Sequence, residues 1–440
     1  MHNGISGKCF QNWANTYSCW PSLYFEPETI EEIKEILKSA NENKKVVKVV
    51  GVGHSPSSIA CTDDYMISLN KFNRIIDIDS KSLLAKVQGG IRLDKLNDIL
   101  YDNNMALSVL GSISDQTIAG AVCVGYHGTG ISYGILSNYV REIEMILASG
   151  KIKTYSKTQN SEEFGAVLCS LGCLGVILTV TIECEPAFKL EQIEFPAKLE
   201  DVLHSLDSYK KSSDHFRMLW YPHTDHVLCY SASRTNKTVN PRKFNWIKDR
   251  IIGYYILEFL FYIATFFNFL IPYINLIYFK IFSSRKEYVD RSYNVFNFDC
   301  LFKQYAFESA IPIKETAFYL LELKSWLENN PSVKVHFGVE IRFSKSDDIW
   351  ISPCYNQDSC WLNILMFRPY GKEYAREEWW KINQKLMNDC KGRPHWAKTH
   401  SLKKSDLVEL YPKFEDFDNL RKKLDPNEIF INDCLRHLFS

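Results

Sequence analysis

The first part of the chain alternates short helical and strand patterns. Apolar residues recur at helical spacing from Ile30 to Leu37, and Thr29 with Glu32 forms a capping-box pattern directly before them. The β-branched run at 46–50 follows this predicted helix and ends at a glycine. These patterns predict a helix that leads into a buried strand.

The same alternation continues to about residue 187. Residues 74–79 and 83–90 predict a hairpin, and residues 92–104 predict a helix. Strand patterns then recur at 142–155 and at 174–186. Short helices that alternate with strands and hairpins predict an α+β fold rather than a helical bundle.

The second part of the chain contains a regular two-residue alternation. From Val333 to Phe343, every second residue is apolar, which predicts one strand. Glu340 and Arg342 project from the polar face of this strand. They form either a solvated strand face or a pair that binds a ligand, and spacing alone leaves both interpretations open.

Residues 251–282 break the globular pattern. The 21 residues between Glu258 and Lys280 carry no charge, close to the roughly 20 that a membrane-spanning helix needs. Two interpretations remain: a pair of buried core helices, or contact with a membrane. Because the segment contains Pro272, we expect a helical pair broken at this proline rather than a straight span.

Composition narrows the class of protein. A chain of 440 residues is too long for one ordinary core, so we expect two domains. The 52 basic and 52 acidic residues balance, and no basic block suggests a nucleic-acid partner. The 13 cysteines form no Cys/His cassette, which argues against a metal site. The N-terminus has no apolar core of the kind that a cleavable signal peptide requires.

Two glycine-bearing stretches are each expected at a strand end, and each contains a histidine. The first is Gly51-Val52-Gly53 with His54, and the second runs from Leu110 to Gly134 with six glycines in 25 residues. Glycine-rich turns either serve only as turns or direct backbone N–H groups at phosphate. His54 has no ligand at metal spacing, and an imidazole on a loop tip is a nucleophile near neutral pH.

Several motifs together resemble one family of flavoproteins. They are VGVGHSPSSIACTDDYMI, LGSISDQTIAGAVCVGYHGTGI, LGCLGVILTVTIECEP, FKQ before AIP, GVEIRF, MFRPYGK and GRPHWAKTH. The chain resembles the vanillyl-alcohol-oxidase class, and VEIR together with HWAK resembles its aldonolactone oxidoreductase branch. The resemblance covers essentially the whole chain.

The resemblance implies an FAD-binding domain at 1–187, a substrate cap domain at 188–390 and a C-terminal segment, 391–440, that returns to the FAD site. It implies that FAD is attached covalently through His54. The other residues expected at the cofactor are Gly51, Val52, Gly53, Ser55, Gly111, Ser112, Ser114, Thr117, Gly120, Gly125, His127, Gly128 and Val176.

The resemblance also implies the reaction. The expected substrate is L-gulono-1,4-lactone, oxidised at its C2 hydroxyl, and the expected catalytic residues are Glu340, Arg342, His395 and Lys398. Ser112, Glu340, Arg342 and Lys398 are expected to bind the substrate. Gly111 lacks a Cβ, which in this family is associated with access of dioxygen, so we expect an oxidase. A dehydrogenase or an alditol oxidase of the same branch is the alternative. Residues 251–282 are then expected to contact the bilayer of the endoplasmic reticulum.

Overall fold

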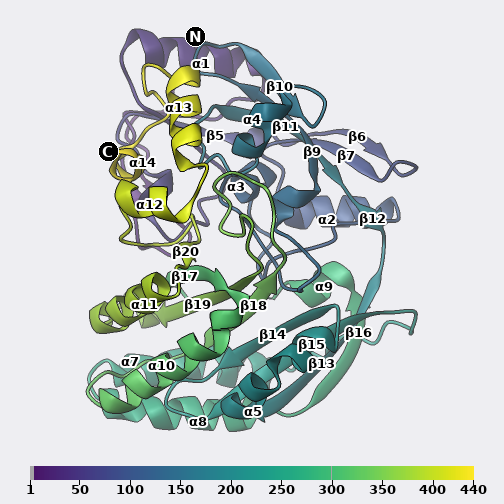
Figure 1. Ribbon diagram of the computed structural model, residues 1–440, viewed down its shortest axis with the longest axis vertical. Helices are drawn as coiled ribbons and strands as arrows, with labels where there is room; N and C mark the ends of the chain where they lie inside the picture. The colour runs from purple at the N-terminus through teal and green to yellow at the C-terminus, as the bar shows by residue number, and fades with distance from the viewer. Residues whose placement is uncertain (1–3, 299) are drawn as a thin grey trace.

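The computed structural model describes residues 4–298 and 300–440, and Figure 1 shows two halves of different architecture. The upper half combines the N-terminal part of the chain with the C-terminal helices, and the lower half is built on one large sheet. The mixture of helices, one small parallel sheet and larger antiparallel sheets confirms the predicted α+β class.

The upper half begins with a parallel sheet and its helix. The strand order is β3 (Leu23–Phe25), β5 (Tyr65–Ser68) and β4 (Val47–Val50), and the helix is α1 (Ile30–Glu42). Helix α1 begins at the predicted capping box, in which Thr29 and Glu32 bond reciprocally. Strand β4 ends at Val50, so the glycine turn that follows leaves the sheet at a strand end.

A five-stranded antiparallel sheet completes the upper half. Its order is β10 (Ile152–Ser156), β9 (Val140–Ile146), β11 (Val176–Glu183), β7 (Leu84–Gln88) and β6 (Ile75–Asp79). Helices α2 (Leu93–Asp102), α3 (Ile118–Cys123) and α4 (Ser161–Val167) connect these strands, and α12 (Lys404–Leu410), α13 (Phe414–Leu424) and α14 (Asp433–Phe439) pack beside them. The predicted hairpin and strand pair are confirmed. Two short pairs, β1 (Phe10–Gln11) with β2 (Ser18–Cys19) and β8 (Met105–Ala106) with β12 (Glu185–Pro186), lie at the edges.

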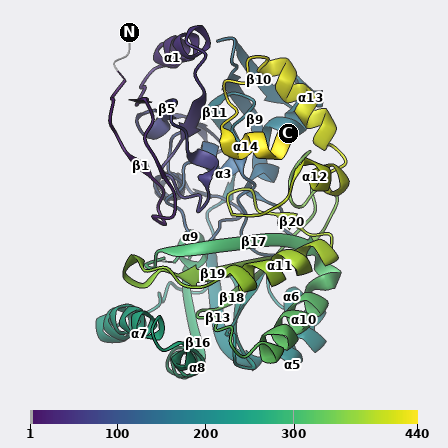
Figure 2. The ribbon, with the colours of Figure 1, turned by 90° about the vertical axis from the view of Figure 1, so that its left-hand side faces the viewer.

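The lower half is an eight-stranded antiparallel sheet. Its order is β16 (Lys286–Arg291), β13 (Lys189–Lys198), β15 (His226–Thr235), β14 (His215–Trp220), β18 (Val339–Ser344), β19 (Ser359–Phe367), β17 (Gln304–Pro312) and β20 (Arg393–Pro394). Helices α5 (Leu199–His204), α6 (Leu206–Lys211), α10 (Thr316–Asn329) and α11 (Glu377–Asp389) pack on the side shown at the right of Figure 2. Because β20 comes from the C-terminal segment, the chain after residue 390 joins this sheet before it returns to the upper half.

The strand predicted over 333–343 is only half correct. Regular pairing begins at Val339, because Phe337 has a positive φ of 70°, which an extended strand does not allow. Both faces of β18 are buried. The interpretation of Glu340 and Arg342 as a solvated face is therefore wrong: they are 8% and 7% exposed.

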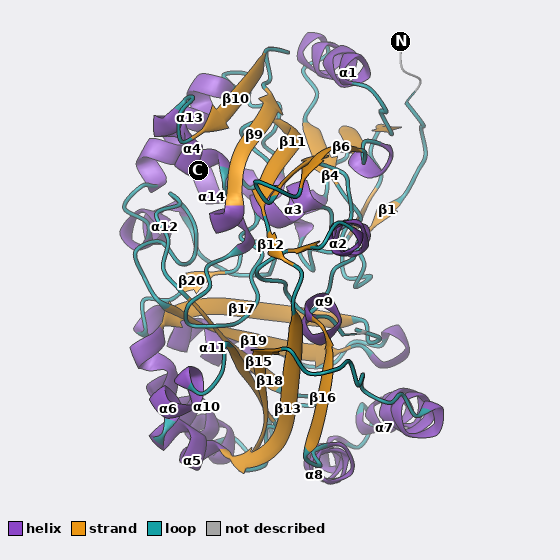
Figure 3. Cartoon of the chain, turned by 90° about the vertical axis from the view of Figure 1, so that its right-hand side faces the viewer, coloured by secondary structure: helices purple, strands orange, loops and turns teal. Residues whose placement is uncertain are grey.

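Residues 246–282 form a helical hairpin at the outer edge of the lower half (Figure 3). A π-helical turn (Trp246–Ile256) continues into α7 (Leu257–Ala264), and α8 (Ile271–Phe282) follows. The predicted break at Pro272 is wrong. Helix α7 ends at Ala264, before the proline. Pro272 lies in the first turn of α8, where its missing N–H removes no helical hydrogen bond. Among the described residues, no helix is both long and apolar enough to cross a bilayer.

Candidate active site

A groove in the upper half connects the two predicted glycine turns. It is open to solvent and is lined by residues of the turns after β4 and before α3, by Leu171, Gly172, Gly175 and Ile177, and by His395 and Lys398. Gly51 lets the two turns approach each other, because a Cβ at this position would lie 2.1 Å from Oγ1 of Thr117. The groove therefore depends on a missing side chain where the turns meet.

The structure places the predicted cofactor residues in two groups. Gly51, Val52, Gly53, His54, Ser55, Thr117 and Gly120 line the groove. Gly111, Ser112 and Gly128 line a second, smaller cavity. Val176 lies in β11 between Gly175 and Ile177, which line the groove, whereas Ser114, Gly125 and His127 line neither space.

His54 lies at the groove with one ring nitrogen available. Its ring stacks on Trp13 at 5.6 Å, and Nε2 is 3.9 Å from the Asp115 carboxylate. Nδ1 is buried without a hydrogen-bond partner among the described residues. Burial lowers the pKa of His54 to about 4, so the imidazole is neutral at physiological pH. A neutral ring with an unpartnered nitrogen has the chemistry of a nucleophile.

The groove fits an elongated anionic cofactor. The turn around Gly51 and Gly53 can direct backbone N–H groups at phosphate. Lys48 also lines the groove; it is 3% exposed and its ammonium bonds only to a backbone carbonyl, that of Leu171, among the described residues. Burial lowers the pKa of Lys48, and phosphate in the groove would favour its charged form. An orphaned imidazole nitrogen and a buried lysine without an acidic partner are features that a bound dinucleotide would satisfy.

The register of the large sheet assembles a second cluster next to the groove. Glu340 of β18 lies opposite Asn363 of β19, and Asn363 lies opposite Glu308 of β17. Two residues further along β18, on the same face of the sheet, Arg342 lies opposite Trp361. Residues from three strands thus lie side by side on one face of the sheet, although Glu308 and Asn363 are more than fifty residues apart in the chain.

Glu308 is the centre of this cluster. Its carboxylate accepts from Nη2 of Arg342 at 3.1 Å, is 3.6 Å from Nζ of Lys398 and is 3.1 Å from Nε2 of His127. Burial alone would raise the pKa of Glu308, but Arg342 and Lys398 outweigh burial and hold this pKa well below its ordinary value. Glu308 is therefore ionised throughout the physiological range.

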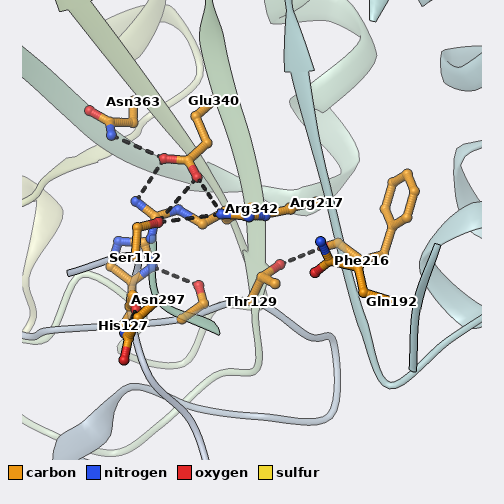
Figure 4. A network of polar contacts seen from close by, with 12 residues as sticks. Ser112, His127, Thr129, Gln192, Phe216, Arg217, Asn297, Glu340, Arg342 and Asn363 are labelled. Atoms are coloured by element: carbon orange, nitrogen blue, oxygen red, sulfur yellow. Dashed lines mark hydrogen bonds and ion pairs between the residues drawn. The ribbon is translucent and has the colours of Figure 1, made fainter. Parts of the chain in front are cut away.

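Glu340 is held from several sides, as Figure 4 shows. It accepts from Arg217 of β14 at 3.3 Å and from Asn363 at 3.3 Å, and its Oε2 is 3.3 Å from Nη2 of Arg342. Oγ of Ser112 donates to it at 3.4 Å. Ser112, Glu340 and Arg342, predicted from distant parts of the sequence, are thus brought together.

Both histidines of the cluster contact Trp361: His127 stacks on its ring, and His395 packs edge-on against it. The His127 ring lies 3.6 Å from the Trp361 ring and 5.4 Å from the His395 ring. Burial lowers the pKa of both imidazoles, and it lowers that of His395 to well below the ordinary value. His127, expected at the cofactor, instead bonds to Glu308, and His395 lines the groove.

The polar atoms of His127, Glu308 and His395 lie within 4.8 Å of one another, a spacing that a metal ion would also accept. However, Arg342 and Lys398 already bind Glu308. Two fixed cations beside the same carboxylate oppose the binding of a third. The cluster is better described as a buried ion-pair network.

Sequence reasoning missed Glu308, Arg217 and Asn363. Glu308 lies in the run Tyr305–Pro312, where one acidic residue interrupts an otherwise apolar strand. A buried carboxylate in such a strand requires a partner, and this signal could have identified it. The roles of Arg217 and Asn363 follow only from the strand register.

Comparisons with known proteins agree with this arrangement. Residues 180–438 match the family model described as D-arabinono-1,4-lactone oxidase, and residues 21–156 match an FAD binding domain. The L-gulonolactone oxidases of Scyliorhinus torazame and Bos taurus are 48% and 44% identical over 440 residues, which is all of this chain and all of each relative. An L-gulono-1,4-lactone dehydrogenase of Mycobacterium tuberculosis is 30% identical and aligns with 98% of this chain and 99% of its own.

Solved structures share the fold at lower identity. A solvent-stable cholesterol oxidase superposes with a TM-score of 0.82 at 17% identity, covering 98% of this chain and 97% of its own. A chitooligosaccharide oxidase superposes with a TM-score of 0.72 at 14% identity, covering 96% and 93%. The FAD binding domain, the groove and the family match lead to one conclusion: the chain belongs to the D-arabinono-1,4-lactone oxidase family of FAD-dependent oxidoreductases, which includes the L-gulonolactone oxidases.

Proposed function

We propose that the protein oxidises L-gulono-1,4-lactone at its C2 hydroxyl and reduces dioxygen to hydrogen peroxide. One observation carries this proposal beyond the family match. Lys398 lines the groove that contains His54 and also approaches Glu308, the centre of the ion-pair network. A cofactor in the groove and a lactone on the network would therefore meet at Lys398.

The residues of the network bind and orient the lactone. When bound, FAD supplies the hydride acceptor and returns the electron pair to dioxygen. The ring hydroxyls of the substrate can donate to Glu340 and accept from Arg342. Burial opposes the ionisation of Glu340, but Arg342 and Arg217 outweigh it and lower its pKa, so the carboxylate stays an acceptor.

The C2 hydroxyl loses its proton as the hydride leaves C2. Two ionised carboxylates, Glu308 and Glu340, lie in the network to accept a hydrogen bond from this hydroxyl. Lys398 and Arg342 place positive charge where negative charge develops on hydride transfer. The resulting 2-keto lactone has an acidic C3 hydrogen and isomerises to the enediol, L-ascorbate.

The tether to FAD is proposed at His54. The unpartnered Nδ1 of a neutral imidazole at the groove supports a bond to the 8α-methyl carbon of the isoalloxazine ring. His54 would hold the ring in the groove, and the two-electron reduction of the flavin that accompanies such a bond would require an external oxidant such as dioxygen.

Oxidase activity is proposed from Gly111. The position of its absent Cβ lies 2.9 Å from the Tyr126 ring and from the His127 carbonyl oxygen. Tyr126 lines the groove and accepts from the Gly111 N–H at 2.7 Å. A side chain at position 111 would therefore press on a wall of the groove, and glycine leaves that wall undisturbed.

Membrane contact is proposed for the helical hairpin at 246–282. Its exposed apolar side chains include Trp246, Ile247, Tyr255, Phe259, Phe266, Phe267, Phe269, Tyr273 and Ile277. Many exposed apolar side chains on helices that also carry basic residues, here Lys248 and Lys280, are typical of helices that lie in the membrane interface. We place the enzyme on the endoplasmic reticulum membrane with both flanks of the hairpin on one side.

The experiment is a product balance with the purified protein. We expect one hydrogen peroxide for each L-gulono-1,4-lactone consumed under air, with ascorbate as the other product. Turnover that requires an added electron acceptor and yields no peroxide would instead indicate a dehydrogenase. No turnover of any aldonolactone would overturn the proposed function.

A further inference from the structure

A small polar cavity lies beside the ion-pair network, on the side of Ser112 and Arg342. Its polar lining includes Ser112, Gln192, His215, Arg217 and Arg342, and Ala232 of β15 forms part of its apolar wall. Phe296 also lines it, with its ring edge-on to His215 at 4.8 Å. The cavity has space for little more than one water-sized group, the size of a hydroxymethyl.

Two buried polar atoms of the residues that line this cavity have no partner within the described part of the chain. They are Nε2 of His215 and Nε of Arg342. Nδ1 of His215 is 2.8 Å from the carbonyl oxygen of Thr129, so Nδ1 carries the hydrogen. Burial lowers the pKa of His215 to about 4, so the ring is neutral and Nε2 is an acceptor. Nε–H of Arg342 is a donor.

The chemistry of these atoms specifies the ligand. A hydroxyl group both donates and accepts a hydrogen bond, so one hydroxyl can satisfy the acceptor of His215 and a guanidinium donor together. An ammonium group lacks the acceptor, and Arg217 and Arg342 oppose a further positive charge. A carboxylate cannot donate to Nε2 of His215.

Arg217 adds a rigid donor to the same space. Its guanidinium lies 4.5 Å from the Tyr230 ring and 4.9 Å from the Phe298 ring, and Nη1 donates to Glu340 at 3.3 Å. Stacking and ion pairing hold this side chain in place before any substrate arrives. The wall is therefore preorganised, which favours specificity at low entropic cost.

We propose that this cavity binds the terminal hydroxymethyl of the substrate's exocyclic arm and so selects hexonolactones over pentonolactones. The inference rests on the proposed function. A 1,4-lactone of six carbons carries a two-carbon glycol arm outside the ring, whereas a five-carbon lactone carries a single hydroxymethyl. With the ring hydroxyls on Glu340 and Arg342, only the longer arm extends to His215.

The test is the ratio of kcat/KM for L-gulono-1,4-lactone to that for D-arabinono-1,4-lactone, measured in the flavin-loaded enzyme. Ala232→Val fills the cavity from its apolar wall. His215→Asn retains a donor for Thr129 but withdraws the acceptor from the position of Nε2, because the asparagine side chain is shorter. We expect both variants to lower this ratio by at least about tenfold, through KM of the six-carbon lactone. Ser231 lies on the opposite face of β15 from Ala232, so Ser231→Val is the matched control. In this variant the ratio of the two kcat/KM values should stay unchanged.

The outcomes are distinguishable. If both lactones lose activity equally in variants that keep their flavin and their melting temperature, the cavity holds only a structural water and the inference is wrong. If Ala232→Val does not fold, His215→Asn alone decides. If the wild-type protein oxidises neither lactone, the proposed function has failed instead.

Discussion

Arg342 and Glu308 form a buried ion pair of 3.1 Å across the large sheet, although β19 separates the strands that carry them. Their side chains are 8% and 1% exposed. Both side chains are long enough to reach over the intervening strand. Arg342, which was predicted to bind the substrate, is therefore held in place by Glu308, a residue that none of the sequence motifs includes.

Glu308→Gln should lower turnover by about 100-fold or more while leaving flavin bound. The amide retains the shape of the side chain but removes the charge that holds Arg342 and Lys398 together. Activity in lysed cells does not separate a loss of turnover from a loss of bound flavin, so both should be measured on the purified protein. Glu373→Gln, at an exposed ion pair with Arg368 and Arg376, is the control and should retain activity.

Arg342→Ala and Lys398→Ala should each reduce turnover by orders of magnitude with flavin retained. Arg342→Ala should also destabilise the fold by about 3 kcal/mol or more, because it leaves two buried carboxylates without their shared cation. Stopped-flow reduction and urea unfolding measure the two effects. Near-normal flavin reduction in either variant would remove that residue from the mechanism.

The same ion pairs predict the acid stability of the protein. The pKa of Glu308 is depressed in the folded state, so its contribution to stability is present above the unfolded pKa of about 4.3 and is lost as pH falls from there through the folded value. The free energy of unfolding should therefore fall more steeply below about pH 4.3 in the wild type than in Glu308→Gln. Parallel curves for the two proteins would show that Glu308 has an ordinary pKa.

Gly51→Ala should lower the incorporation of the cofactor during folding. The added methyl would lie 2.1 Å from Thr117 Oγ1 and push apart the two turns that form the groove. We expect flavin content after purification to fall severalfold. Gly150→Ala is the control: it has a positive φ of 79° but no atom within 4 Å of the added Cβ, so it should cost some stability and no flavin.

Replacing Phe266, Phe267 and Phe269 with serine should release the protein from anionic lipid vesicles. These side chains are exposed on the hairpin outside the site, so turnover on the soluble lactone should persist. Vesicle flotation and peroxide release measure the two properties. Unchanged flotation of the triple variant would mean that the hairpin is not the membrane contact.

Local patterns predicted most of the elements. The capping box at Thr29 begins α1, and the alternation at 74–90 forms the β6–β7 hairpin. Predictions from local patterns failed where tertiary packing, rather than the local sequence, decides where a strand or helix begins and ends. Phe337 adopts a positive φ and ends the strand that its alternation predicts, and Pro272 begins a helix instead of breaking one.

The candidate site, like the fold, could be predicted only where its residues are contiguous in the sequence. The glycine turn with His54 and the VEIR strand were visible in the sequence, because each is a contiguous motif. Glu308, Arg217 and Asn363 were not, since their proximity depends on the register of strands far apart in the chain. The environment of His127 could not be predicted either, because its partner is Glu308 and not the cofactor groove.

The most direct test is anaerobic mixing of the purified, flavin-loaded protein with L-gulono-1,4-lactone while the visible flavin absorbance is followed. We expect rapid bleaching in the wild type, at least about 100-fold slower bleaching in Glu308→Gln, and full recovery of colour with peroxide release when air is admitted. An absorbance that the lactone leaves unchanged in the wild type would contradict the proposed function.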